Sequence, residues 1–204
     1  MNDFRIEDGV LVRYLGAGGA VTVPDGVIRI GESAFYNCRA LTAVRLPEGL
    51  TAIGPQAFDG CDSLTDLPLP AGLCEIGVAA FLGCCSLTAI TIPAGVAVIG
   101  DDAFLNCTGL TSVTLAEGVA AIGERAFADC TGLTALCLPA SLRSIGRDAF
   151  DGCTALAEIT AHTAALTLGD DAFGSCPVAH VRCPAALARR LARACPTAEI
   201  VVQG

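Results

Sequence analysis

The sequence predicts an α/β repeat solenoid, in which similar coils stack along one axis. The motif Ile/Leu-Gly-x-x-Ala-Phe-x-x-Cys recurs every 23 residues without an insertion. Between its copies, apolar residues alternate with small or polar ones, as in a strand with one buried face. A unit this short cannot bury its own apolar side chains, so neighbouring units must pack together. The motif's phenylalanines are Phe35, Phe58, Phe81, Phe104, Phe127, Phe150 and Phe173, and its cysteines are Cys38, Cys61, Cys84, Cys107, Cys130, Cys153 and Cys176.

Residues 1–20 predict an N-terminal β-hairpin cap. Two short segments with strand-like composition, 4–7 and 10–14, flank Asp8-Gly9, a pair that two-residue type I′ turns favour. The glycine-rich segment 16–19 then interrupts the chain. A solenoid needs such a cap, because the apolar end of its first coil would otherwise face water.

Residues 21–184 predict the repeat array, with about seven repeats of 23 residues. Each repeat divides into a strand, a type I turn, a second extended side and one helical turn. In one repeat these parts are residues 41–46, 47–49, 50–53 and 55–61. Stacking pairs each strand with its equivalent in the next coil, about 4.8 Å away, and so builds a parallel sheet along one side.

Residues 185–204 predict a C-terminal cap of one helix and one strand. The helix follows Pro184, and Leu187, Leu191 and Ala194 share one of its faces. The strand covers residues 199–202. The opposite helix face carries three arginines, which are either solvated or meet an acidic partner or an anionic surface. They are Arg189, Arg190 and Arg193.

Composition excludes several function classes. The net charge is −9 and all twelve cationic side chains are arginine, so the sequence predicts no nucleic-acid binding and no catalytic lysine. No run of 18 apolar residues occurs, so we expect no membrane insertion. The first eight residues show no signal peptide, which favours the cytoplasm for the chain as it stands. A chain that is part of a longer protein could instead be extracellular or at the cell surface.

Seven of the twelve cysteines occupy one repeat position that faces inward. A row of seven equivalent thiols leaves an odd member, which disfavours a disulfide framework. A buried thiol packs as a small apolar group and forms weak hydrogen bonds, so these cysteines can also serve a backbone group at the bend of each coil. We therefore interpret them as structural thiols and expect no metal and no cofactor.

Residues 110–130, Leu-Thr-Ser-Val-Thr-Leu-Ala-Glu-Gly-Val-Ala-Ala-Ile-Gly-Glu-Arg-Ala-Phe-Ala-Asp-Cys, closely resemble the BspA-like bacterial leucine-rich repeat. The resemblance extends from about Val21 to Pro184. It implies a right-handed coil with a parallel sheet on one face. Proteins of that family are mostly linked to protein binding, adhesion and host contact, and they share no catalytic residues. The resemblance thus implies a non-enzymatic interaction module that binds a protein partner, or alternatively a fragment of a bacterial surface adhesion protein.

Two surfaces are candidate interaction sites. The first is the outward face of the strands, where residues alternate with the buried ones. Its variable positions include Arg45, Asp66, Thr91, Thr114, Cys137 and Glu158. The alternative is that these residues merely suit parallel strands. The second is an apolar patch on the helical-turn side, where equivalent positions are mostly polar; its residues are Val78, Leu82, Cys85 and Leu105. Such a patch indicates weak self-association. The alternative is a monomer with scattered surface leucines, which are common on soluble proteins.

A third candidate joins Cys137, Glu158 and His180, which fall on successive coils, with His162 nearby. Cysteine, histidine and carboxylate together bind zinc or build a Cys–His nucleophile. No local CxxC or HExxH spacing supports either, so degenerate terminal repeats are the favoured interpretation. The sequence predicts no catalytic residue.

Overall fold

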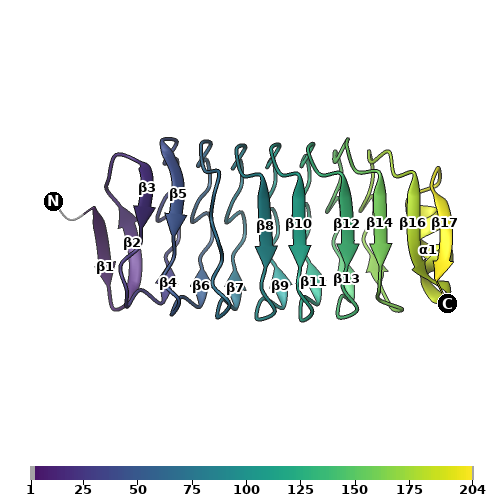
Figure 1. The fold of residues 1–204 in the computed structure, drawn as a ribbon, viewed down its shortest axis with the longest axis horizontal. Coiled ribbons are helices and arrows are strands. Elements are labelled where there is room, and N and C mark those ends of the chain that lie inside the picture. Colours follow the sequence, from purple (N-terminus) through teal and green to yellow (C-terminus); the bar gives the residue numbers. More distant parts are fainter. Residues whose placement is uncertain (1–2, 204) are drawn as a thin grey trace.

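Coils stack along one axis in the computed structural model, which describes residues 3–203. Figure 1 shows the N-terminal hairpin at one end of the stack and helix α1 (Ala185–Ala194) at the other. Parallel strands from consecutive coils pair with each other, which confirms the predicted solenoid. Residues 1, 2 and 204, which belong to the predicted caps, lie outside the described part of the chain.

The longer strands lie along one side, which we call the strand face. They are β3 (Gly19–Thr22), β5 (Leu41–Arg45), β8 (Ala89–Ile92), β10 (Ser112–Leu115), β12 (Ala135–Leu138), β14 (Glu158–Ala161), β16 (His180–Pro184) and β17 (Glu199–Gln203). In β8, β10 and β12, exposed residues alternate with buried ones, as their sequence pattern predicts.

A second, narrow sheet runs along an adjacent side. It begins with the hairpin β1 (Phe4–Glu7) and β2 (Val10–Tyr14) and continues through strands of two residues each. These are β4 (Arg29–Ile30), β6 (Ala52–Ile53), β7 (Glu75–Ile76), β9 (Val98–Ile99), β11 (Ala121–Ile122), β13 (Ser144–Ile145) and β15 (Thr167–Leu168). Equivalent isoleucines pair in register, for example Ile99 with Ile122, which keeps the coils aligned.

The third side consists of the Gly-x-x-Ala-Phe-x-x-Cys segments, which we call the turn face. Our expectation of one helical turn per repeat was wrong, because two residues in most of these segments have left-handed backbone angles. In the segment 100–107 they are Asp102 (φ 55°) and Asn106 (φ 61°). The backbone N–H groups therefore alternate in direction. The N–H groups of Asp102 and Phe104 donate to the next coil, and those of Ala103 and Leu105 donate within their own coil.

The seven phenylalanines form a continuous ladder inside the stack. All are buried, and consecutive rings lie 4.8–5.4 Å apart with interplanar angles of 1–14°. The ladder extends further than the motif. Tyr14 lies 5.1 Å from Phe35, and Phe4 lies 5.5 Å from Tyr14, so the hairpin supplies two more rings.

The repeated glycine allows adjacent coils to approach closely. A Cβ atom at Gly100 would lie 2.8 Å from the carbonyl carbon of Gly77 and 2.9 Å from its oxygen. Backbone atoms of a neighbouring coil cannot move aside without breaking the coil-to-coil hydrogen bonds. This glycine is therefore required for the space it leaves between backbones.

Both caps adopt the expected elements. Asp8 (φ 48°) and Gly9 (φ 77°) are left-handed, as a type I′ turn requires, and join β1 to β2. At the other end, Leu187 and Leu191 of α1 are buried against the core, and β17 pairs with β16. The predicted limits of the caps and the array, 1–20, 21–184 and 185–204, remain predictions.

The sheet of the strand face is interrupted, although stacking predicts a continuous one. Strands β3 and β5 form one sheet, β8 and β10 a second, and β12, β14, β16 and β17 a third. Between β5 and β8, the third coil has only an isolated bridge, from Asp66 to Ala43. Pro68 has no N–H group to donate to a ladder, which explains the break at this coil.

Candidate functional site

The six residues predicted to bind a partner are exposed on the strand face, in two neighbouring rows that run along the stack. A row holds the equivalent position of consecutive coils, which the strand register defines. Arg45, Thr91, Thr114 and Cys137 share one row, and Asp66 and Glu158 share the other. The fold thus gathers residues that are up to 113 positions apart in the sequence onto one surface.

Three of these residues surround the break at Pro68. A depression of about 260 Å³ lies between the third coil and β8, and Asp66 and Thr91 line it. A second, of about 270 Å³, lies between the second and third coils and is lined by Arg45 and Glu48. Within residues 3–203, no backbone hydrogen bond joins residues 66–69 to β8. This break was not predicted, although Pro68 marks it in the sequence.

The predicted apolar patch lies on the turn face and is more recessed than expected. Val78 is 49% exposed, whereas Leu82 and Leu105 are half-buried. Tyr36 occupies the position of Leu82 two coils earlier and is 44% exposed. The structure thus leaves Val78 and Tyr36 as the prominent apolar side chains on this side, and only one of them was predicted.

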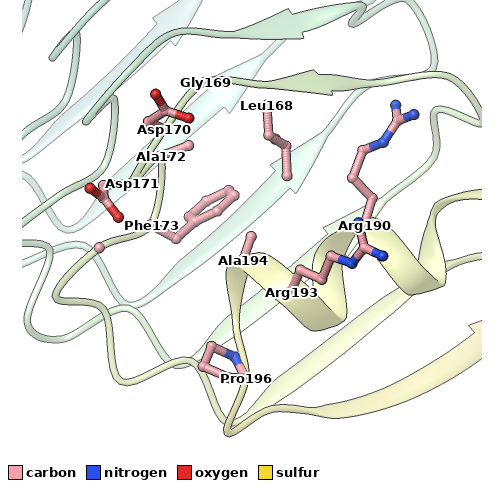
Figure 2. A pocket seen from close by; sticks show the side chains of 11 residues that line it. Leu168, Gly169, Asp170, Asp171, Ala172, Phe173, Arg190, Arg193, Ala194 and Pro196 are labelled. Atoms are coloured by element: carbon pink, nitrogen blue, oxygen red, sulfur yellow. The ribbon is translucent and has the colours of Figure 1, made fainter.

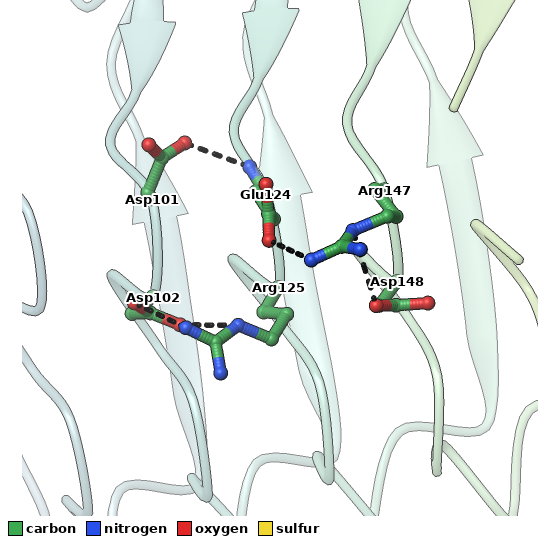
Figure 3. Close-up of polar contacts among 6 residues, drawn as sticks. All are labelled: Asp101, Asp102, Glu124, Arg125, Arg147 and Asp148. Carbon is green, nitrogen blue, oxygen red and sulfur yellow. Dashed lines mark hydrogen bonds and ion pairs between the residues drawn. The ribbon is translucent and has the colours of Figure 1, made fainter. Parts of the chain in front are cut away.

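Beyond Val78, the turn face carries a network of charged contacts that the sequence analysis did not identify (Figure 3). Asp101 accepts a hydrogen bond of 2.8 Å from the backbone N–H of Glu124, and Arg125 lies 3.1 Å from the Asp102 carboxylate. Arg147 lies 2.7 Å from Glu124 and lowers the pKa of its carboxyl. Each contact joins residues of adjacent coils that are one repeat apart in the sequence, and this spacing could have revealed the contacts.

Cys137, Glu158 and His180 lie on the successive strands β12, β14 and β16, as the sequence predicts, but the three residues do not share one row. Glu158 pairs with His180, and His180 Nδ1 lies 3.4 Å from the carboxylate of Glu199. Cys137 pairs instead with Thr160, one row away. No group of three potential metal ligands occurs in the described part of the chain.

The motif cysteines contact backbone carbonyls inside the stack. The Cys130 thiol donates to the carbonyl oxygen of Phe104 over 3.3 Å, and five other motif cysteines do the same at 3.0–3.3 Å. This confirms that the thiol can serve a backbone group at the bend of the coil. Burial raises the pKa of Cys61 and of Cys130 to about 12, so both thiols stay protonated and unreactive at neutral pH.

A cavity of about 600 Å³ lies at the C-terminal end, between the last turn segment and α1 (Figure 2). Asp170, Asp171 and Phe173 line one wall, and Arg190 and Arg193 line the other. Arg190 donates a hydrogen bond to the carbonyl oxygen of Leu166 and so ties the helix to the last coil. The arginines were candidates for an acidic partner from the sequence, but the carboxylates that face them were not predicted.

The description "BspA type leucine rich repeat region" fits six copies in this chain, over residues 19–93 and 74–192. The chain belongs to this family. The BspA-type assignment agrees with the sequence resemblance and with the repeated residues buried inside the stack. A search of curated proteins found no match. Among residues 3–203, no helix is both long and apolar enough to cross a membrane.

Solved structures of other bacterial leucine-rich repeat proteins share the fold of this BspA-type chain. A protein of T. pallidum is 35% identical, with a TM-score of 0.79, over 95% of this chain and 91% of that one. One of Bacteroides ovatus is 34% identical, with a TM-score of 0.78, over 87% of this chain. A leucine-rich cell surface protein of Faecalibacterium prausnitzii is 20% identical, with a TM-score of 0.52, over 96% of this chain and 90% of that one. This chain covers 47% of the Bacteroides ovatus protein, about half its length.

Proposed function

We propose that this BspA-type chain is a non-enzymatic module that binds a protein partner through its strand face, centred on the break at Pro68. The observation that carries the proposal is the convergence of three features there. Two depressions adjoin each other, the backbone of the third coil is unpaired toward β8, and Arg45, Asp66 and Thr91 surround both.

The chemistry of this surface suits an extended polypeptide. Backbone N–H and C=O groups that lack a partner beside the two depressions can hydrogen-bond an extended segment that lies across the strand face, and the side chains around them select its sequence. Arginine is enriched in binding hot spots, and Arg45 is the arginine among the six predicted residues. Asp66 supplies an opposite charge nearby. A partner segment with both charges matches this arrangement.

The test compares partners captured by the wild-type protein and by the double variant Arg45→Glu, Thr91→Arg. We expect the double variant to lose a partner that the wild type retains, because it reverses one charge and blocks the depression beside β8. The matched control is Arg39→Glu, Thr108→Arg, which makes the same changes at exposed positions off the strand face. Identical partner sets for all three proteins would refute the proposal, provided that their melting temperatures agree.

A second proposal concerns location: the chain is a piece of a longer, exported surface protein. It is supported by the length of the Bacteroides ovatus relative and by the name of the Faecalibacterium prausnitzii one. Protease accessibility on intact cells of the source organism tests it. Complete protection of the array until the cells are lysed would contradict it.

A further inference from the structure

The C-terminal cavity exposes a segment whose sequence also occurs inside the stack. Inside the stack, another coil binds that segment. The segment Gly169-Asp170-Asp171-Ala172-Phe173 is identical in sequence to Gly100-Asp101-Asp102-Ala103-Phe104. The inner copy is covered by the next coil. The outer copy has no next coil and lines the cavity instead. The contacts made at the inner copy therefore show what the outer copy can bind.

At the inner copy, three residues of the next coil, Glu124-Arg125-Ala126, make four polar contacts. The N–H of Asp102 donates to the Glu124 carbonyl over 2.9 Å, and the N–H of Phe104 donates to the Ala126 carbonyl over 2.7 Å. The N–H of Glu124 donates to the Asp101 carboxylate over 2.8 Å. The Arg125 guanidinium lies 3.1 Å from the Asp102 carboxylate.

The outer copy keeps the same groups without their partners. The N–H groups of Asp171 and Phe173 form no hydrogen bond within residues 3–203, although their equivalents in all six preceding coils donate to the next coil. The Asp170 and Asp171 side chains are exposed. Polar backbone groups at such a position bind either water or a ligand that offers carbonyl oxygens.

Helix α1 supplies the remaining charges. In the interior, the Glu124 carboxylate is bound by an arginine of the following coil, Arg147, at 2.7 Å. At the end of the stack, Arg193 and Arg190 of α1 stand across the cavity from Asp170 and Asp171 (Figure 2). Carboxylates on one wall and guanidinium groups on the other match a ligand with adjacent opposite charges.

We propose that the C-terminal cavity binds a segment of another polypeptide with the sequence acidic–arginine–small, in the way that Glu124-Arg125-Ala126 binds the inner copy. Its two carbonyls accept from the N–H groups of Asp171 and Phe173, its arginine pairs with Asp171, and its acidic side chain pairs with Arg193. The cavity volume, about 600 Å³, lies within the range of ligand pockets. This site lies apart from the strand face, so the two proposals stand or fall separately.

The test titrates the ¹⁵N-labelled full chain with the peptide acetyl-Gly-Glu-Arg-Ala-amide. We expect saturable shifts of the Asp171 and Phe173 amide signals with a dissociation constant of about 1 mM or below. The variant Asp171→Asn keeps the shape and tolerates the left-handed backbone (φ 50°) but should bind at least about tenfold more weakly. The peptide with glutamine in place of arginine should lose affinity to a similar degree.

The control variant is Asp25→Asn, an exposed aspartate in another turn, which should bind the peptide as the wild type does. The absence of shifts at Asp171 and Phe173 up to about 5 mM peptide would overturn the proposal. Equal binding by Asp171→Asn would overturn it as well. A concentration-dependent dimer that Asp171→Asn abolishes would replace the proposed partner with a second copy of this chain.

Discussion

Replacing Phe104 with alanine tests whether the aromatic ladder stabilises the stack. Its ring is fully buried and stacks 5.0 Å from Phe81 and 5.0 Å from Phe127. Truncating a buried phenylalanine costs about 3–5 kcal/mol, which combines lost burial with the cavity left behind. Two parallel neighbours hold the walls of that cavity in place, so we expect about 4 kcal/mol, in the middle of this range.

The measurement is urea-induced unfolding followed by far-ultraviolet circular dichroism, since the chain has no tryptophan. The comparison variant is Phe173→Ala, at the end of the ladder. Phe173 stacks on one ring, Phe150, at 5.4 Å, so its loss should cost about 1 kcal/mol less. Because Tyr14 stacks on Phe35 at the other end of the motif ladder, we expect the cost of Phe35→Ala to approach that of Phe104→Ala.

Two results would refute this reasoning. A loss below about 1 kcal/mol for Phe104→Ala would mean that the coils collapse around the missing ring, and that the ladder is not rigid. A larger loss for Phe173→Ala than for Phe104→Ala would mean that α1, rather than the neighbouring rings, limits relaxation. The more conservative Phe104→Leu keeps most of the volume and should cost about 1–1.5 kcal/mol, which shows that the assay resolves graded losses.

Three further predictions use the same unfolding assay. Gly100→Ala should cost about 2–3 kcal/mol, because its Cβ meets the Gly77 backbone at 2.8 Å, whereas Gly49→Ala, with open space around it, should change stability by less than about 1 kcal/mol; equal effects would contradict the close-approach argument. Burial raises the pKa of Cys130 from 9.0 to about 12, so the unfolded thiol ionises first and stability should fall as the pH rises from about 9 to about 12. Cys130→Ala should remove up to about 1.4 kcal/mol per pH unit of that fall, and an unchanged slope would show that the native thiol ionises normally. Leu82→Asp with Leu105→Asp should lower stability only modestly, because aspartate occupies equivalent half-buried positions in other coils; if light scattering gives the wild-type mass for the variant, the apolar patch has no role in self-association.

The interior of the protein could be predicted from the sequence because every coil faces the same packing problem. The position of Phe104 recurs in seven coils, and alternation in segments such as 112–115 states which side chains face inward. Comparison of the copies identifies the inward positions even where the pattern of a single strand is irregular. The hairpin followed from Asp8-Gly9, a local turn signal that needs no knowledge of the rest of the chain.

Two features of the interior escaped prediction because no repeated residue type marks them. The left-handed position before Ala-Phe holds residue types as different as Ala79, Asp102 and Arg125, so no residue preference marks it. Coil-to-coil hydrogen bonds impose that conformation. Tyr14 was missed because it lies 21 residues before Phe35 and falls outside the repeat period, although its ring joins the ladder.

Contacts between charged residues at the candidate sites could be predicted only once the stacking order of the coils was known. Arg125 and Asp102 are one repeat apart and were separate residues in the sequence, but in the stack they form a contact. At the last coil, the stacking order leaves the equivalent aspartate without such a contact. Asp171 has the neighbours of Asp102 in sequence but no arginine from a following coil. In a stack of equivalent coils, the end of the array therefore exposes the groups that every interior coil satisfies. A cap that leaves a cavity over them, as α1 does, preserves their capacity to bind.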